Sequence, residues 1–156
     1  MKKVILACFS LTLVLLCGAG MAAHAQNVKG GPVENVLRDP ALEKESKHNL
    51  EVARHYFKLK KAYRAAIARC EEIIAGNPNF SQLDEVLYIA GAGSLRMAEN
   101  RGKQSPNLPP EKLRDDARDY LSRVVNEFPE SKFSEQAEIE LRPIGGVKPK
   151  AVVSSQ

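Results

Sequence analysis

Few residues after the first 25 positions of this chain could carry out chemistry. They include two histidines, His48 and His55, which lie seven positions apart. In a helix that spacing separates them by about 10 Å along the axis, at roughly 1.5 Å per residue, which is too far to share one metal ion. Glu51 lies four residues before His55, and a pair at that spacing is common on helix surfaces. The histidines therefore predict a solvated helix face and no metal site.

The remaining candidate groups also have structural explanations. Cys70 falls on the apolar face of a predicted helix, where cysteine is a small core residue. Asp115 and Asp116 fall in the first turn of another helix, where acidic side chains offset the helix dipole. Gly91-Ala92-Gly93 lies inside a helical pattern and so does not form a phosphate-binding loop. We therefore expect no catalytic residue, no metal and no cofactor, and we predict that the protein is not an enzyme.

The first 25 residues have the layout of a secretory signal peptide. Lys2 and Lys3 precede an apolar run from Val4 to Leu16, and Ala23-His24-Ala25 provides an A-x-A cleavage site. The apolar run is shorter than the roughly 20 residues that cross a bilayer as a helix. This pattern predicts an exported, periplasmic protein that begins at Gln26.

A lipoprotein signal is the alternative, with Cys17 as the lipidated first residue. The residue before it is Leu16, where such signals have a small side chain. Membrane association is then either indirect or through this anchor, and the association of the protein with the outer membrane depends on which form exists. Both forms stay open at this point.

Charge and cysteine content narrow the class of partner. The 156 residues carry a formal charge of +4, and loss of the two signal lysines leaves +2 on the remaining 131 residues. A mixed surface of this kind does not predict nucleic-acid binding. One basic cluster, residues 58–61 with Arg64, is interpreted as a solvated turn, with contact to anionic lipid or an acidic partner as the alternative. Cys70 is the only cysteine after the signal, so no internal disulfide is expected.

Two segments share one helical pattern of apolar residues that ends at a proline. In each, the apolar positions follow the three-to-four-residue spacing of a single helix face, and the two prolines lie 51 positions apart. These residues form the predicted repeat-packing signature together with Gly91. They are Tyr63, Ala66, Ile67, Cys70, Ile74 and Pro78 in the first copy, and Ala117, Leu121, Val124, Val125 and Pro129 in the second.

A second amphipathic helix precedes each copy, over residues 43–59 and 83–98. Within the latter, Gly91 belongs to a run of four small residues, 90–93. An interior glycine costs roughly 1 kcal/mol of helix propensity, so we expect close helix packing to compensate for it. Successive hairpins that cannot bury their apolar faces alone predict an all-α fold. We expect a short α-solenoid of about two repeats plus a fifth capping helix, over residues 133–142.

The predicted domain organisation follows from these elements. Residues 1–25 form the signal peptide, 26–42 a flexible tether, 43–142 the helical domain and 143–156 a disordered tail. The tail begins where Pro143, Gly145 and Gly146 interrupt the helical pattern. A long turn at residues 100–110 explains why the repeat period is 51 and exceeds the usual ~34.

The repeat-packing signature resembles that of tetratricopeptide (TPR) repeats, which place an aromatic, an alanine and a closing proline at these offsets. The linker with Pro129, Ser131, Phe133, Glu135 and Ala137 is similar to that of TPR proteins of the bacterial cell envelope.

Within that branch the chain resembles the BamD-type outer-membrane assembly lipoproteins, and the TPR domain of CpoB-type proteins is the second resemblance. Arg54 departs from the repeat pattern, which has a small residue there. The BamD-type resemblance implies a non-catalytic periplasmic scaffold in outer-membrane protein assembly. The CpoB-type resemblance implies an accessory adaptor of cell-wall or division machinery.

In both cases the expected partners are other envelope proteins or peptides, without nucleic acid or a small-molecule substrate. The first helix of each hairpin lines the inner surface of such solenoids. Tyr88 is the strongest candidate anchor, because an aromatic side chain with a polar tip is a common contact residue. The candidate partner-binding residues are His48, Glu51, His55, Lys58, Glu85, Tyr88 and Arg96.

Overall fold

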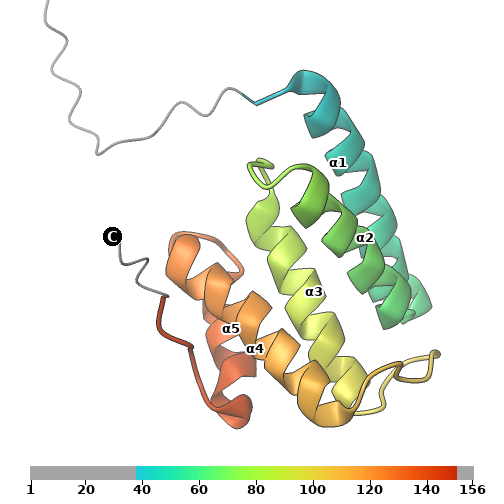
Figure 1. The fold of residues 1–156 in the computed structure, drawn as a ribbon, viewed down its shortest axis with the longest axis vertical. Helices are drawn as coiled ribbons and strands as arrows, with labels where there is room; N and C mark the ends of the chain where they lie inside the picture. Colours follow the sequence, from blue (N-terminus) through green and yellow to red (C-terminus); the bar gives the residue numbers. More distant parts are fainter. Residues whose placement is uncertain (1–37, 151–156) are drawn as a thin grey trace, which may run out of the picture. The chain divides into compact units, whose positions relative to one another are not determined.

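The computed structural model describes residues 38–150, and every regular element within that range is helical (Figure 1). The predictions for the signal peptide, for Cys17, for residues 26–37 and for residues 151–156 lie outside the described residues. The elements are α1 (Pro40–Arg54), the π-helix η1 (His55–Lys60), α2 (Tyr63–Gly76), α3 (Leu83–Ala98), α4 (Pro110–Glu127), α5 (Ser134–Leu141) and the short 3-10 helix η2 (Arg142–Ile144).

The first helix begins earlier than the sequence pattern indicated. The Asp39 side chain accepts a hydrogen bond of 2.8 Å from the backbone N–H of Ala41, and Pro40 occupies the first turn, where its missing N–H costs nothing. Helix α1 therefore starts at Pro40, inside the range expected to be a tether. It continues directly into η1, and Lys61, the residue after η1, is in the left-handed conformation with φ of 51°.

The helices pack as successive hairpins, which confirms the predicted all-α fold. Each helix from α1 to α5 contacts the next one in the chain, and α3 also contacts both α1 and α5. Figure 1 shows α3 between the α1/α2 pair and the α4/α5 pair. The largest fully buried side chains come from all five helices: Leu50, Ile73, Leu87, Ile89, Met97, Leu121 and Leu141.

Close packing of α3 explains the glycines in its interior. A Cβ atom on Gly91 would lie 2.6 Å from Cγ of Leu121 and 3.2 Å from the backbone oxygen of Ala117 on α4. A Cβ on Gly93 would lie 3.1 Å from Cγ1 of Ile67 on α2. The two glycines thus let neighbouring helices approach α3 from two sides, which confirms the expectation of close helix packing.

The predicted long turn joins α3 to α4 and is tied to the first hairpin. The backbone N–H of Lys103 donates to the carbonyl oxygen of Lys61 at 3.0 Å. Gly102 has φ of +104°, and a Cβ there would lie 2.6 Å from that same oxygen. Glycine is therefore required at Gly102 for the long turn to pack against the turn between η1 and α2.

The C-terminal end of the described chain is more ordered than the glycine-rich sequence suggested. We expected a disordered tail from residue 143, but Ile144 packs against the core, and residues 145–148 form hydrogen bonds with α4. Polar side chains of α4 hold the backbone of this segment, and its composition gives no sign of them. Among the described residues, no helix is long and apolar enough to cross a membrane.

Candidate protein-binding face

Helices α1 with η1 and α3, which open the two hairpins, and the fifth helix α5 share one surface of polar and aromatic side chains. We call this surface the inner face and define it by Arg54, Glu85, Tyr88, Arg96, Phe133 and Glu140. Helix α3 contributes the central three residues, α1 contributes Arg54, and α5 with the residue before it contributes the last two. Two clusters of contacts hold these side chains in place.

The first cluster joins α1 to α3. Arg54 donates to both carboxylate oxygens of Glu85, from Nε at 2.7 Å and from Nη2 at 2.8 Å, and Nη2 also donates to Gln82 at 2.9 Å. The Glu85 side chain is 9% exposed and that of Arg54 32%. The hydrogen bonds from Arg54 hold the pKa of Glu85 below its usual value, although burial opposes this. Glu85 is therefore an ionised carboxylate that serves the α1–α3 contact.

The second cluster joins α3 to α5. The Tyr88 hydroxyl donates to Oε1 of Glu140 at 3.0 Å, and Arg96 donates to the same carboxylate at 3.3 and 3.4 Å. Arg96 also donates to the carbonyl oxygen of Ala92 at 2.8 Å. Burial and then the charge of Glu140 raise the pKa of Tyr88 to about 12, so its hydroxyl stays a hydrogen-bond donor at neutral pH.

Aromatic rings give the inner face its apolar area. The rings of Tyr88 and Phe133 stack with centroids 5.1 Å apart and an interplanar angle of 20°. The ammonium of Lys132 lies 4.9 Å from the centroid of Phe133, and the guanidinium of Arg96 lies 4.9 Å from that of Phe57. Both pairs are within range of cation–π attraction and place basic groups against aromatic rings at the start of α5 and in η1.

The two crossovers that lead into α3 and α5 are fixed by similar contacts. Glu43 of α1 accepts from the backbone N–H of Ser81 at 3.0 Å and from its hydroxyl at 2.8 Å. Asp84 of α3 accepts from the hydroxyl of Ser131 at 2.6 Å. In both places an acid in the first turn of a helix, α1 or α3, accepts from the serine that lies just before α3 or α5, respectively. This repeated contact sets the spacing of the inner face.

The predicted partner-binding residues fall into two groups. Glu85, Tyr88 and Arg96 on α3 belong to the inner face, where side chains of α1 and α5 already bind them. The side chains on α1 and η1 are exposed: His48, Glu51, His55 and Lys58.

Three residues of the inner face were missing from the sequence-based set. Arg54 had a signal, because it stands where the TPR pattern has a small residue. Phe133 also had a signal, since it belongs to the quoted linker. Glu140 had none, because a glutamate on a short helix is ordinary. Its role depends on where α5 packs.

The predicted repeat-packing residues lie at the hairpin contacts and at the two crossovers. Tyr63, Ala66, Cys70, Gly91, Ala117, Leu121 and Val124 are buried, whereas Ile67, Ile74 and Val125 are partly buried. Pro78 and Pro129 are exposed, one in each crossover. The prolines thus mark helix ends and are not core residues.

Cys70 and possible groups of metal ligands are the parts of the described chain where reactive chemistry could be expected. Cys70 is fully buried, and burial raises the pKa of its thiol well above the usual range, so it is a neutral thiol at physiological pH. Within residues 38–150, no three His, Cys, Asp or Glu side chains are grouped so that they could hold a metal ion. The inner face itself presents aromatic, basic and acidic groups that neighbouring helices hold in place.

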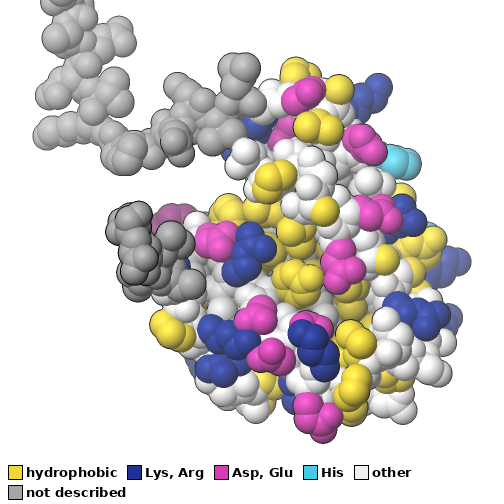
Figure 2. All heavy atoms as spheres, viewed as in Figure 1, with side chains coloured by type: hydrophobic (Ala, Val, Ile, Leu, Met, Phe, Trp, Pro, Cys, Tyr) yellow, Lys and Arg dark blue, Asp and Glu magenta, His cyan; other side chains and the backbone are white. Residues whose placement is uncertain are grey.

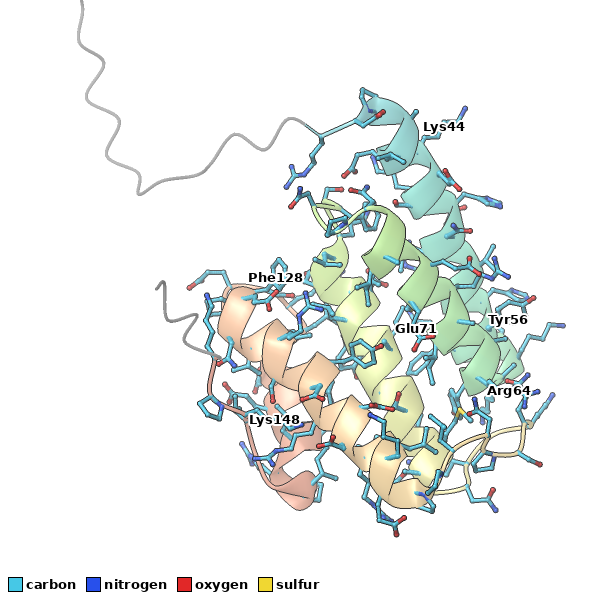
Figure 3. All side chains as sticks on the ribbon, in the orientation of Figure 1. Lys44, Tyr56, Arg64, Glu71, Phe128 and Lys148 are labelled. Carbon is cyan, nitrogen blue, oxygen red and sulfur yellow. The ribbon has the colours of Figure 1, made fainter. Side chains whose placement is uncertain are left out.

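A hollow lies between α2, α3, α4 and the long turn, away from the inner face. It is lined by apolar side chains, which include Ile67, Leu108 and Leu113, and by Tyr120, whose hydroxyl donates to Glu71 at 3.3 Å. Burial and then the charge of Glu71 raise the pKa of Tyr120 to about 12. Figure 3 labels Glu71 on α2.

On the face drawn in Figure 2, basic, acidic and hydrophobic side chains are interspersed, as the composition indicated.

Comparison with known proteins gives one match. Residues 38–145 match the family model YfiO, described as outer membrane lipoprotein. This range includes α1 to α5 and every residue of the inner face. Neither the curated proteins nor the solved structures gave a match.

Proposed function

Since the chain belongs to the YfiO family of outer membrane lipoproteins, we propose that it is a non-catalytic TPR-type scaffold that binds other cell-envelope proteins during outer-membrane protein assembly, as BamD-type proteins do. Membership in this family implies an exported protein of the cell envelope. The proposal adds a binding role, a periplasmic site of action and a surface for it, the inner face.

The observation that carries the proposal is the rigid aromatic centre of the inner face. Tyr88 is partly buried, stacks on Phe133 and is fixed by Glu140, so contact with a partner costs little side-chain entropy. Aromatic side chains held in this way are typical energetic anchors of protein interfaces. The exposed residues of α1 and η1, from His48 to Lys58, form the polar rim in this proposal.

The test is affinity purification of the full-length tagged protein from its own envelope, with and without Tyr88→Ala. We expect the unchanged protein to recover barrel-assembly components. Loss of a central anchor costs about 2 kcal/mol, or roughly 30-fold in affinity, so the variant should lose most of that recovery. Recovery of division or peptidoglycan-linked proteins in place of assembly components would instead support the CpoB-like role.

Tyr120→Ala is the matched control. Tyr120 is also partly buried, donates to a glutamate and has a similarly raised pKa, but it lies on α4 in the hollow beside the long turn. We expect this variant to retain its partners. If the two variants lose partners equally, the effect comes from general destabilisation and the inner face is not the binding surface.

The family description supports the lipid-anchored form of the chain. The large side chain of Leu16 before Cys17 instead favours cleavage before Gln26. Mass spectrometry of the mature protein from membrane and soluble envelope fractions separates the two. A diacylated or triacylated chain that starts at Cys17 establishes the anchor. An unmodified soluble chain that starts at Gln26 excludes it and makes membrane association indirect.

A further inference from the structure

The C-terminal segment lies against the outer side of α4, away from the contacts of the inner face. Here Lys148 donates from its backbone N–H to the Ser122 hydroxyl at 2.8 Å, and its carbonyl oxygen accepts from Nδ2 of Asn126 at 2.8 Å. Its ammonium contacts Asp115, at 2.7 Å, and Asp119. Figure 3 labels Lys148 beside α4. A single residue of the segment thus meets four side chains of one helix.

The four α4 side chains form a stripe along the helix, at successive spacings of four, three and four residues. Two of them bind the backbone of the segment and two bind the lysine ammonium. Ser122 is 3% exposed, and its described partner is this backbone N–H. A surface that binds a segment's backbone at two points and its lysine ammonium through two carboxylates can accept other segments with lysine in that register.

The segment itself is held weakly. Ile144 packs against the core, but Val147 is 38% exposed, and Pro149 and Lys150 are exposed as well. Its two backbone hydrogen bonds with α4 are part-buried, but the two acids that hold the Lys148 ammonium are more than half exposed, so water and salt keep the gain from these ion pairs small. Segments with few buried apolar contacts open at a low free-energy cost.

Two glycines lie between the packed Ile144 and the residues that contact the stripe. Gly145 and Gly146 have φ of +99° and +71°, which favours glycine at both positions. Arg118 donates to both of their carbonyl oxygens, at 2.7 and 2.8 Å. Arg118 thus fixes the chain up to Gly146, and only the residues after Gly146 have to leave α4 for the stripe to be exposed.

We propose that the α4 stripe of Asp115, Asp119, Ser122 and Asn126 is a binding site for an extended, lysine-bearing segment of a partner protein, which the chain's own residues 147–150 occupy until a partner displaces them. The site lies outside the inner face and does not depend on the function proposed for that face. Because the few residues between Ile144 and Lys148 keep this lysine close to the stripe, its effective concentration there is high, and the stripe is exposed only part of the time.

The experiment uses the full mature chain and a fluorescent peptide with the sequence of residues 143–150, PIGGVKPK. Lys148→Glu in the chain places a third acid beside Asp115 and Asp119 and should release the segment. We expect fluorescence anisotropy to show peptide binding to this variant at least 10-fold tighter than to the unchanged chain. Asp115→Asn with Asp119→Asn in the Lys148→Glu chain should reduce that binding at least 10-fold, at low salt.

Lys150→Glu is the matched control, because it makes the same charge change two residues further on. It should behave like the unchanged chain, and a peptide with glutamate in place of its first lysine should not bind the Lys148→Glu chain. Lys148→Ala is a milder second variant, and circular dichroism verifies that each chain stays helical. The proposal is wrong if the peptide binds neither the Lys148→Glu chain nor the Lys148→Ala chain, or if it binds the unchanged chain as tightly as these two.

Discussion

The two clusters of the inner face use the same residue types in different ways. At the α1–α3 junction, Arg54 grips both oxygens of Glu85 at 2.7 and 2.8 Å and no aromatic hydroxyl takes part. At the α3–α5 junction, Arg96 reaches Glu140 at 3.3 and 3.4 Å and shares that carboxylate with Tyr88. The first junction is a tight ion pair, whereas the second is a looser network.

The difference follows from what else each arginine contacts. Arg96 also donates to a backbone carbonyl of its own helix and lies over the ring of Phe57, so its position does not depend on Glu140 alone. Arg54 has its shortest bonds to Glu85, whose side chain is only 9% exposed. The comparison shows that the first junction stabilises α1–α3 packing through a nearly buried ion pair, while the second leaves Tyr88 partly exposed.

The largest expected effect is at the first junction. Arg54→Ala leaves the carboxylate of Glu85 buried without its main partner, so we expect a loss of about 2 kcal/mol in the free energy of unfolding. Urea denaturation followed by circular dichroism measures it. The control replaces both partners, Arg54→Met with Glu85→Leu, and should recover most of the loss. A loss below that of Glu140→Ala would contradict the ranking of the two junctions.

At the second junction, Glu140→Ala removes the acceptor of Tyr88 and one partner of Arg96. We expect a smaller loss of about 1 kcal/mol in the same measurement, because both donors are partly exposed and Arg96 keeps its contacts with Ala92 and Phe57. Tyr88→Phe removes one of these hydrogen bonds and should cost less than Glu140→Ala. Equal losses for Arg54→Ala and Glu140→Ala would show that the two junctions contribute alike.

The pH dependence of stability sharpens the comparison. Arg54 lowers the folded-state pKa of Glu85 from the ordinary 4.5, so Glu85 contributes stability above that pH and loses the contribution as pH falls through its lower folded pKa. The stability difference between the unchanged chain and Glu85→Gln should be constant near neutral pH and shrink below about pH 4.5. Urea unfolding of both chains from pH 7 to pH 3 measures it. A difference that stays constant over that range would exclude the ion pair as its source.

The smallest effect is expected away from both junctions. Arg123 and Glu127 form a pair within α4 at 3.0 Å, with side chains 38% and 34% exposed. Such pairs are screened by water and salt, so Arg123→Ala should change the free energy of unfolding by no more than about 0.5 kcal/mol. Urea denaturation in low and high salt provides the measurement. A change as large as that at Glu140 would mean that surface pairs, and not the junctions, dominate the electrostatic contribution.

The contribution of the sequence to the candidate site was uneven. The face expected to bind a partner included Tyr88, Glu85 and Arg96, because residues on one side of a helix follow from its periodicity. The same reasoning on the first helix selected His48 and His55, which are exposed, but not Arg54, which reaches the next first helix. Helical spacing predicts on which side of its own helix a residue lies, but not which side chain of a neighbouring helix it contacts.

The sequence by itself determined the helices, their order and the close packing at Gly91. Backbone hydrogen bonds in a helix are local, so apolar spacing, prolines and the small residues around Gly91 were enough to predict hairpins and close packing. Only the tertiary structure decided that Glu140 completes the inner face and that Lys148 lies on α4. These contacts join residues 44 and 29–33 positions apart, and their partners depend on how the helices pack against one another.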